Sequence, residues 1–375
     1  MAGRLSLNII FIVQGEGRGH MTQAIALQEI LKKQGHILKA VLVGRSEKRV
    51  IPNFFYKEIT SPIHTFESPN FVFDPANKSI KIFKSLIYNL TKLPTFLRNI
   101  NTIHHHVVNY KPDIIINFYD LLAGLYVTFK NPGIPYLVIG HQYFLDHPVF
   151  IFPQGKKFDQ YLMKLSNRIT SLKAQKKLAL SFRKYSDSEK TKIKIVPPLI
   201  RKEVIRLIPS NEKFILVYMV NSGYGEDVMR WHKKNPTVVL HCFWDKKEAP
   251  EEYKVNENLT FHKIDDVKFL RYMASCSAYV STAGFESICE AMFLGKPVMM
   301  VPAHGHYEQK CNAIDAVNSK AGISSEEFDI SKLINYIPIH PSDNSEFKDW
   351  VINGDDYFQK ELEFLIPKRT QAIAM

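Results

Sequence analysis

Long hydrophobic runs and paired cysteines are both missing from this sequence of 375 residues. No apolar run reaches the ~18 residues that a membrane-spanning helix needs, so we expect no transmembrane helix. The first residues show no long apolar core followed by a small-residue cleavage site. We therefore expect no signal peptide and a cytoplasmic protein. The four cysteines show no C-x-x-C spacing, which predicts neither a zinc site nor a disulfide framework.

The composition is that of a globular protein, with 45% hydrophobic and 23% charged residues. The length is too great for one ordinary core and fits two domains. Apolar runs typical of buried strands alternate with helical patterns, and the alternation restarts after a Pro-Pro pair. This β-α-β order predicts an α/β fold of two Rossmann-like, doubly wound parallel-sheet domains. We expect them at residues 1–198 and 199–345, with a helical segment, 346–375, packing back on the first domain.

The formal net charge of +12 is concentrated in two stretches. Residues 75–112 carry six Lys or Arg and no acid, and residues 155–185 carry nine with one acid, Asp159. Both stretches mix apolar and cationic residues, which is typical of helices lying on an anionic bilayer. The alternative is that their lysines are merely solvated on the wall of an acceptor site. No nucleic-acid-binding motif accompanies the charge, so we expect no nucleic-acid partner.

The loop VQGEGRGHMTQA, residues 13–24, stands between an expected strand and an expected helix. Its glycines are wrongly spaced for the dinucleotide fingerprint, and no G-K-[ST] follows as in a P-loop, so a nicotinamide or flavin enzyme is disfavoured. The loop does place His20 at a helix N-terminus, where open α/β folds bind ligands. The positive helix end favours a neutral imidazole that can accept a proton. The alternative is a histidine that only caps or packs.

A second group of candidate residues lies between residues 264 and 313. STAGFES follows an expected strand and begins a helix with small residues and free amides, which suits a phosphate. Glu290 lies two turns into this apolar helix, either on its solvated face or facing ligand hydroxyls. Glu308 and Gln309 begin a later helix, also at the carboxyl edge of the predicted sheet.

Together, GEGRGH and STAGFESICEAMFLGKPVMMVP...EQKCNA resemble the GT-B glycosyltransferases. The sequence is most similar to the MurG-like branch, which includes the lipid-II-forming N-acetylglucosaminyltransferase and plant-type galactolipid synthases. The C-terminal match covers about fifty residues, and both motifs have the order and separation seen in that family. The resemblance implies an acceptor-binding first domain and a nucleotide-sugar-binding second domain, which face each other across a central cleft.

For the donor, the resemblance implies that Glu290 grips the ribose hydroxyls through charge-assisted hydrogen bonds. It implies that Glu308 and Gln309 contact the hydroxyls of the donor sugar. The usual glycine-rich diphosphate loop is reduced here to NSGYG, which leaves its phosphate contacts open. The other implied donor contacts are Ser222 and Gly223 in that loop, Ser281, Thr282, Ala283 and Gly284 at the diphosphate, Lys263 and Ile264 near the base, and Gly17, Arg18 and Gly19 from across the cleft.

For the acceptor, the resemblance implies that His20 is the general base and that Asp120 could orient it. The alternative for Asp120 is a helix N-cap. The implied reaction is an inverting, metal-independent transfer, with helix N-termini and amides neutralising the leaving diphosphate. UDP is favoured over GDP as the carrier, and no cofactor is expected.

The expected partners are a nucleotide-diphosphate sugar and an acceptor hydroxyl on a lipid or cell-envelope glycan. A peripheral contact with the inner face of the cytoplasmic membrane would bring the protein to such an acceptor. Two alternatives remain open: a nucleotide-sugar 2-epimerase of the same fold, and a non-catalytic protein that binds nucleotide sugars or anionic membranes.

Overall fold

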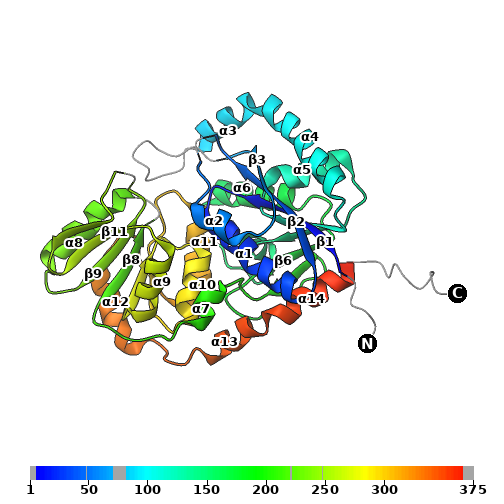
Figure 1. Cartoon of the computed structure of the whole chain (residues 1–375). Coiled ribbons are helices and arrows are strands. Elements are labelled where there is room, and N and C mark those ends of the chain that lie inside the picture. The colour runs from blue at the N-terminus through cyan, green and yellow to red at the C-terminus, as the bar shows by residue number, and fades with distance from the viewer. Residues whose placement is uncertain (1–5, 48, 71–81, 220–221, 247, 366–375) are drawn as a thin grey trace.

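The computed structural model describes residues 6–47, 49–70, 82–219, 222–246 and 248–365. They form two seven-stranded sheets whose helices pack on both faces (Figure 1). The first sheet has the order β3-β2-β1-β4-β5-β6-β7 and the second β10-β11-β9-β8-β12-β13-β14. All paired strands are parallel except β10, which runs antiparallel to β11. The predicted α/β class with two doubly wound sheets is confirmed.

The strands of the first sheet are mostly continuous apolar runs because they are covered on both faces. In β1, for example, residues 9–13 are fully buried. The strands are β1 (Asn8–Gln14), β2 (Ile37–Arg45), β3 (Ile63–Glu67), β4 (Ile114–Phe118), β5 (Tyr136–Ile139), β6 (Lys176–Leu180) and β7 (Ile193–Val196). The helices are α1 (Arg18–Lys33), α2 (Asn53–Glu58), α3 (Ile82–Thr91), α4 (Leu93–Tyr110), α5 (Leu121–Lys130), the 3-10 helix η1 (His141–Asp146) and α6 (Lys157–Thr170).

The second sheet follows the same pattern, with a separate buried cluster between β8, β9, β11 and the helices on one face. Its strands are β8 (Ile215–Met219), β9 (Leu240–Trp244), β10 (Glu252–Asn256), β11 (Leu259–Lys263), β12 (Ala278–Ser281), β13 (Val298–Met300) and β14 (Gly322–Ser324). Its helices are α7 (Lys202–Arg206), η2 (Ser222–Tyr224), α8 (Gly225–Lys234), α9 (Asp266–Ser275), α10 (Phe285–Phe293), α11 (Tyr307–Asn318), α12 (Ile330–Tyr336) and η3 (Ile337–Ile339).

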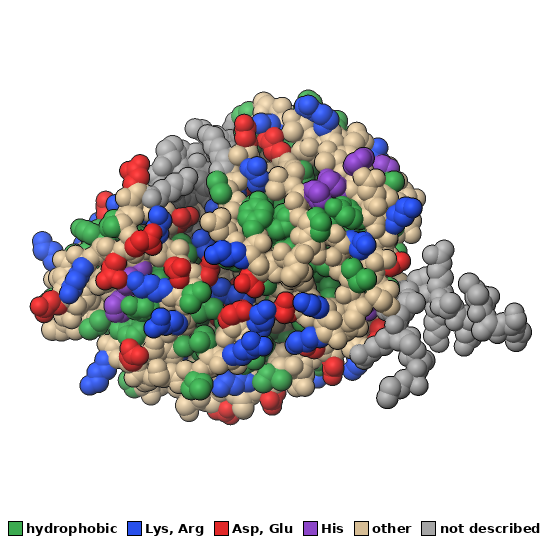
Figure 2. All heavy atoms as spheres, in the orientation of Figure 1, with side chains coloured by type: hydrophobic (Ala, Val, Ile, Leu, Met, Phe, Trp, Pro, Cys, Tyr) green, Lys and Arg blue, Asp and Glu red, His purple; other side chains and the backbone are tan. Residues whose placement is uncertain are grey.

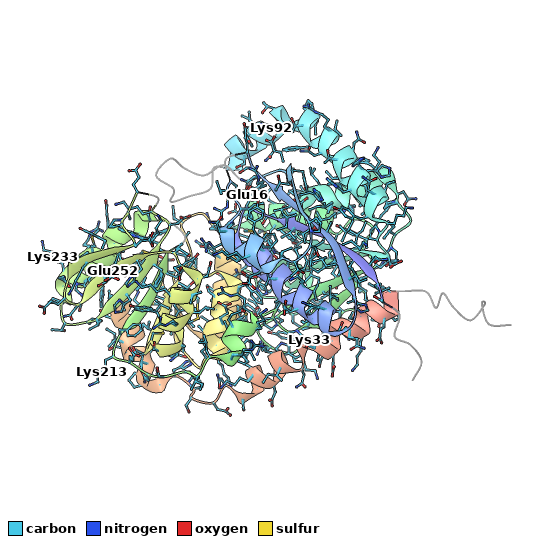
Figure 3. All side chains as sticks on the ribbon, viewed as in Figure 1. Glu16, Lys33, Lys92, Lys213, Lys233 and Glu252 are labelled. Carbon is cyan, nitrogen blue, oxygen red and sulfur yellow. The ribbon has the colours of Figure 1, made fainter. Side chains whose placement is uncertain are left out.

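Two final helices, α13 (Ser345–Ile352) and α14 (Gly354–Leu365), cross from the second sheet to the first (Figure 1). The indole Nε1 of Trp350 donates a hydrogen bond of 3.1 Å to the carbonyl of Ser181. Lys33, at the end of α1 and labelled in Figure 3, pairs at 3.0 Å with Asp355 in the first turn of α14. These contacts tie the end of the described chain to the first domain.

The two basic stretches form helices over part of their length, and the second also contributes a strand. Residues 71–81 lie outside the described residues, and α3 and α4 follow them, with Pro94 in the first turn of α4. In the second stretch only residues 157–170 are helical, and residues 176–180 form β6, which pairs on both sides within the sheet. The helical expectation for this stretch therefore holds only for residues 157–170, because the end of the apolar pattern belongs to a buried strand.

On the face shown in Figure 2, basic and acidic side chains are interspersed rather than separated. In the part of the chain that the structure describes, no helix combines the length and hydropathy needed to cross a bilayer.

Candidate active site

The loops at the carboxyl ends of both sheets meet at the interface between the domains, which we call the cleft. Arg18, at the start of α1, pairs with Asp266 of α9 at 3.2 Å. The ring of His141 in η1 stacks on Phe285 of α10 with 3.9 Å between the centroids. Parallel sheets bind ligands at this edge, so both glycine-containing motifs of the sequence lie where a ligand site is expected.

His20 lies in this cleft as the third residue of α1, which begins after Gly17. Its side chain is almost fully buried, and its ring stacks on Tyr119 at 5.7 Å. Burial lowers the pKa of His20 to about 4, and a hydrogen bond to Gln23 opposes that shift. The imidazole is therefore neutral near pH 7, as predicted, although burial is the main cause rather than the helix end.

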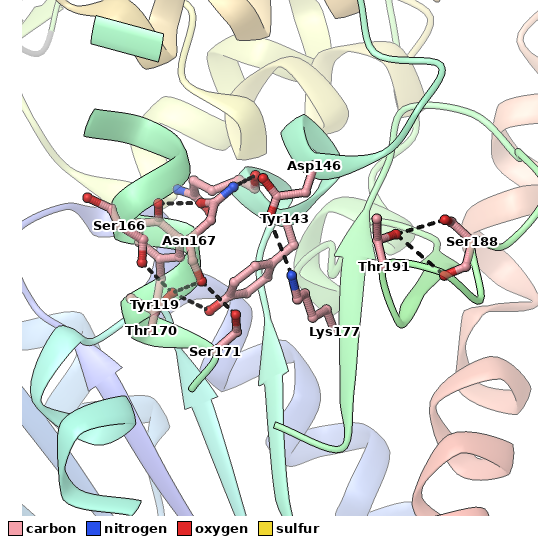
Figure 4. Close-up of polar contacts among 11 residues, drawn as sticks. Tyr119, Tyr143, Asp146, Ser166, Asn167, Thr170, Ser171, Lys177, Ser188 and Thr191 are labelled. Atoms are coloured by element: carbon pink, nitrogen blue, oxygen red, sulfur yellow. Dashed lines mark hydrogen bonds and ion pairs between the residues drawn. The ribbon is translucent and has the colours of Figure 1, made fainter. Parts of the chain in front are cut away.

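Tyr119 is held in an uncommon backbone conformation, with φ of 63°. A left-handed residue other than glycine costs on the order of 1 kcal/mol and needs support from its surroundings. Here the Tyr119 hydroxyl donates to Asn167 at 2.6 Å, and the Asn167 amide donates to the carbonyl of Gln142 at 2.8 Å. Figure 4 shows this buried network, which fixes the aromatic wall beside His20.

Both ring nitrogens of His20 contact glutamine side chains. Nδ1 lies 3.2 Å from Oε1 of Gln23, one helical turn later. Nε2 lies 3.3 Å from Nε2 of Gln142 in η1, and the same amide nitrogen donates to Glu308 at 2.9 Å. Gln23 in turn donates to Glu286 in α10. A chain of five polar side chains thus crosses the cleft from one domain to the other and back.

Asp120 does not contact His20 in this structure, so the expected His–Asp pair is not formed. Its Oδ1 accepts hydrogen bonds from the amides of Leu122 at 2.9 Å and Ala123 at 3.3 Å, as the N-cap of α5. Burial raises the pKa of Asp120 to about 6, while Ser68 and these amides oppose the rise. The amides at the start of α5 have no partner within the helix and donate to the Asp120 carboxylate instead, which explains the orientation of this side chain.

The segment STAG forms a strained turn between β12 and α10. Ala283 has φ of 60°, and its carbonyl accepts a hydrogen bond of 3.0 Å from Asn312. Gly284 is the N-cap of α10 and provides no side-chain cap for the first helical amides. The hydroxyl of Ser281 lies 3.4 Å from that of Ser287, whereas the hydroxyl of Thr282 is buried without a partner among the described residues. This geometry suits an anion.

Glu290 is buried in α10 and paired with Arg201 from the segment that joins the two sheets. Nε of Arg201 donates to Oε1 at 2.7 Å and Nη2 to Oε2 at 2.8 Å. Burial opposes the charge on Arg201, but Glu290 outweighs it and raises the pKa of the guanidinium. The carboxylate expected at the ribose is therefore held through both oxygens by an arginine that the sequence motifs did not indicate.

Glu308 and Gln309, in the first turn of α11, have different surroundings. Burial raises the pKa of Glu308 to about 6, and the hydrogen bond from Gln142 opposes the rise. Gln309 accepts a hydrogen bond of 2.7 Å from the amide of Ala303 and so braces the loop after β13. Glu308 is thus the member of the pair that faces the first domain.

The remaining expected donor residues are spread around the same edge. Lys263 ends β11, and its amide donates to the carbonyl of Glu251 at 3.0 Å. Ile264, which follows it, is half-buried. Ser222 and Gly223 lie in η2 before α8, next to residues 220–221, which lie outside the described residues. Arg18, expected at phosphate, pairs with Asp266 here.

Besides Arg201, the sequence analysis missed Gln23, Gln142 and Glu286. One signal was available, because Gln23 follows His20 by three residues and therefore shares its helix face. Glu286 was visible in STAGFES but was given no role. Within the described ranges, no group of three or more His, Cys, Asp or Glu side chains could hold a metal ion.

Two facing doubly wound domains with these cleft loops define the class of GT-B glycosyltransferases. The model of glycosyl transferase family 1 matches residues 7–340, and the chain belongs to this family. It is thus a glycosyltransferase, and the resemblance to the GT-B enzymes is confirmed.

Similar proteins agree with this class. The UDP-N-acetylglucosamine--N-acetylmuramyl-(pentapeptide) pyrophosphoryl-undecaprenol N-acetylglucosamine transferase of Rickettsia canadensis is 24% identical over 354 residues, covering 86% of this chain and 87% of the relative. An uncharacterised glycosyltransferase of Methanosarcina acetivorans is 22% identical, covering 82% of each chain. The structure of UGT2 of Phytolacca americana, complexed with UDP-2-fluoro-glucose and pterostilbene, has a TM-score of 0.64 at 13% identity, covering 96% of this chain and 99% of that one.

Proposed function

We propose that the protein transfers a sugar from a UDP-sugar to a lipid-linked or envelope-glycan hydroxyl, with inversion and without a metal ion. The observation that carries this proposal is the state of His20. The imidazole is buried and neutral, and it lies between the acceptor domain and the α10 and α11 loops of the other domain. A neutral histidine in that position is suited to take a proton from an attacking hydroxyl.

The step is a single displacement. The acceptor hydroxyl loses its proton to Nε2 of His20 while its oxygen bonds to the anomeric carbon. The bond between that carbon and the diphosphate oxygen breaks, and UDP leaves with the electron pair. The first amides of α10 and the small side chains of residues 281–284 favour the charge that develops on the diphosphate.

Three features support the donor assignment. Glu290 is oriented through both oxygens by Arg201, which suits paired hydrogen bonds to a ribose diol. Glu308 lies beside Gln142 and His20, where a donor sugar would meet the acceptor. UDP is favoured because the Rickettsia relative is named for a UDP-sugar and the Phytolacca enzyme was solved with one.

An apolar cavity supports a lipid acceptor. It has a volume of about 320 Å3 and opens in the first domain between α3, α4 and α5. Leu93 and Leu97 of α4 and Phe129 of α5 line it and are each at least half exposed. Exposed apolar side chains that gather at one opening are typical of a lipid or membrane contact. We infer that the protein sits peripherally at an anionic membrane through this side.

The test is calorimetric titration of the purified protein with UDP, GDP, TDP and CDP, with and without EDTA. Selective micromolar binding of UDP in EDTA supports the donor site and its independence from metal. Binding that requires a divalent cation would overturn the metal-free mechanism. Failure of the folded protein to bind any of the four would overturn the donor assignment.

Turnover is tested separately with His20→Ala, and His64→Ala is the control because His64 lies on β3 and contacts Tyr110. We expect His20→Ala to lose about 10²- to 10⁴-fold in transfer while binding UDP normally. Full activity of His20→Ala would remove the proposed base. Analysis of the anomeric configuration of the product decides between inversion and retention.

A further inference from the structure

Among the residues that the structure describes, no carboxylate pairs directly with His20, because Asp120 caps α5 instead. The nearest polar partner of Nδ1 is the side-chain amide of Gln23, which is 1% exposed. The other end of this amide contacts Glu286, which belongs to the second domain. A carboxylate is therefore linked to the imidazole through one intervening amide, across the cleft.

The Glu286 carboxylate determines which groups donate and which accept along the hydrogen bonds from Glu286 through Gln23 to His20. Burial raises the pKa of Glu286 to about 7, while its own backbone amide and the hydrogen bond from Gln23 oppose the rise. Above that pH the carboxylate is ionised and accepts hydrogen bonds only, so Gln23 turns its amide nitrogen toward Glu286. Its carbonyl oxygen then faces His20 and can only accept, so the proton of the neutral imidazole stays on Nδ1. The lone pair is thereby left on Nε2, the nitrogen that faces Gln142 and Glu308.

We propose that Gln23 and Glu286 are positioning residues for His20, with Glu286 orienting the Gln23 amide so that His20 keeps its proton on Nδ1. The inference rests on the proposed role of His20 as the base. Because Glu286 comes from the second domain, the link forms only when the two domains are in contact. The base is thus oriented in the same conformation that brings the donor loops to it.

The packing around Glu286 fits this role. A β-carbon at position 19 would collide with the Glu286 carboxylate, so Gly19 permits the close approach of the two domains. When Nε2 takes the acceptor proton, the positive charge spreads over the ring and strengthens the hydrogen bond from Nδ1 to the Gln23 carbonyl. The only proton that is transferred is that of the acceptor hydroxyl.

The first test measures the tautomer directly, without substrate. Nitrogen-15 NMR of histidine-labelled protein distinguishes a ring protonated on Nδ1 from one protonated on Nε2, and the His20→Ala spectrum assigns the signals. We expect wild type to show the Nδ1 form, and Gln23→Leu to shift toward the Nε2 form or a mixture. An unchanged Nδ1 tautomer in Gln23→Leu would overturn the proposal.

A matched control is available on the same helix. Gln28 is also buried in α1, but its amide contacts Glu58 and Thr60, away from the cleft. Gln28→Leu should leave the His20 tautomer unchanged. If Gln23→Leu does not fold, Glu286→Gln serves instead, because it keeps the size of the side chain and removes its charge. We expect Glu286→Gln to weaken the preference for Nδ1–H, and an unaltered preference there would equally contradict the proposal.

Turnover separates this inference from the proposed function. We expect Gln23→Leu to lower kcat about 10- to 100-fold with little change in the donor KM, because the base is present but wrongly protonated. A changed tautomer with unchanged kcat would overturn the positioning role and leave His20 as the base. Full activity in His20→Ala would instead overturn the proposed base, whatever the tautomer measurement shows.

Discussion

Arg201 holds both oxygens of Glu290 in a planar, two-bonded contact, and it does so from the segment that joins the two domains. Both side chains are largely buried, at 13% and 3% exposed. Neither charge has ready access to water, so each depends on the other. The orientation of the proposed ribose contact is therefore set by the linker as well as by α10.

Removing the charge of Glu290 should weaken nucleotide binding and also destabilise the fold, because it leaves the buried guanidinium of Arg201 without its ionic partner. We expect Glu290→Gln to raise the Kd for UDP about 10- to 100-fold, because hydrogen bonds to a charged group contribute about 1.5–3 kcal/mol. Calorimetry measures this directly. An unchanged Kd would remove Glu290 from the donor site.

Substitution of Arg201 should affect stability as well. Arg201→Ala leaves a buried, unpaired carboxylate, which costs about 3–5 kcal/mol in the free energy of unfolding. Arg201→Lys should fall between Ala and wild type because an ammonium cannot reproduce the planar two-bonded contact. Lys202→Ala is the control, since Lys202 pairs with Glu29 at 3.3 Å through partly exposed side chains. Denaturant unfolding in which Arg201→Ala matches Lys202→Ala would contradict this account.

The fold could be predicted from sequence because its signals are local. Buried parallel strands such as β1 and β4 are continuous apolar runs. In the helices between them, apolar residues recur every three to four positions. Strand β10 was missed because all five of its residues, Glu252–Asn256, are exposed, and its short polar–apolar alternation lacks the continuous apolar run of the buried strands. Strand β6 was misassigned because Lys176 and Lys177 at its start resemble a basic helix.

The candidate site was predicted only in part, for a different reason. His20 and Glu290 stand in motifs, whereas their partners are identified by distance in space. Gln23 and Glu286 are 263 positions apart, and Arg201 and Glu290 are 89 apart. These contacts depend on how two domains meet, which no local pattern encodes. Asp120 is the opposite case, in which a local interaction decides. Its carboxylate caps the start of α5, whereas the resemblance assigned it to His20.

The apolar cavity gives a prediction about membrane contact. Leu97 lines it and is 52% exposed, so Leu97→Glu should place a charge at the opening without disturbing the core. We expect several-fold weaker flotation with vesicles of phosphatidylglycerol and phosphatidylcholine, because a carboxylate is repelled by anionic lipid and resists burial. Ile208→Glu is the control, because Ile208 is 88% exposed and does not line the cavity. Equal flotation of both variants would argue against this membrane face.

Asp315 gives a prediction about the pH dependence of stability. Its carboxylate lies 3.7 Å from Nε2 of His141 in the domain interface, and both side chains are buried. Burial raises the pKa of Asp315 from 3.8 to about 7, with Arg183 opposing the rise. Burial also lowers the pKa of His141 to about 4, so His141 does not compensate for an ionised Asp315 near neutral pH.

The direction in which stability changes with pH follows from proton linkage. Between about pH 4 and 7 the folded protein holds a proton on Asp315 that the unfolded chain releases, so this group costs stability as the pH rises. We expect Asp315→Asn to raise Tm relative to wild type more at about pH 8 than at about pH 4.5. Asp146→Asn, whose carboxylate pairs with Lys177 at 3.4 Å, should show no such gain at the higher pH. A pH-independent difference for Asp315→Asn would mean that Asp315 is not protonated in the fold.

The last prediction concerns Gln142. Its side-chain amide contacts Nε2 of His20, the nitrogen that should take the proton from the acceptor hydroxyl. Its Nε2 contacts Nε2 of His20 at 3.3 Å and Glu308 at 2.9 Å, while its Oε1 is buried without a partner among the described residues. An acceptor hydroxyl must displace or share this amide before it reaches the imidazole. Until then the side chain keeps water from the base.

Shortening the side chain of Gln142 should therefore uncouple the release of UDP from the transfer of the sugar to the acceptor. We expect Gln142→Ala to release UDP from UDP-sugar several-fold faster without acceptor, because water reaches His20, and to transfer the sugar more slowly. Measurement of UDP release with and without acceptor gives the ratio of hydrolysis to transfer. If both rates fall together, Gln142 supports the site without shielding it from water. If the ratio rises while UDP affinity is unchanged, Gln142 excludes water from the base until the acceptor arrives.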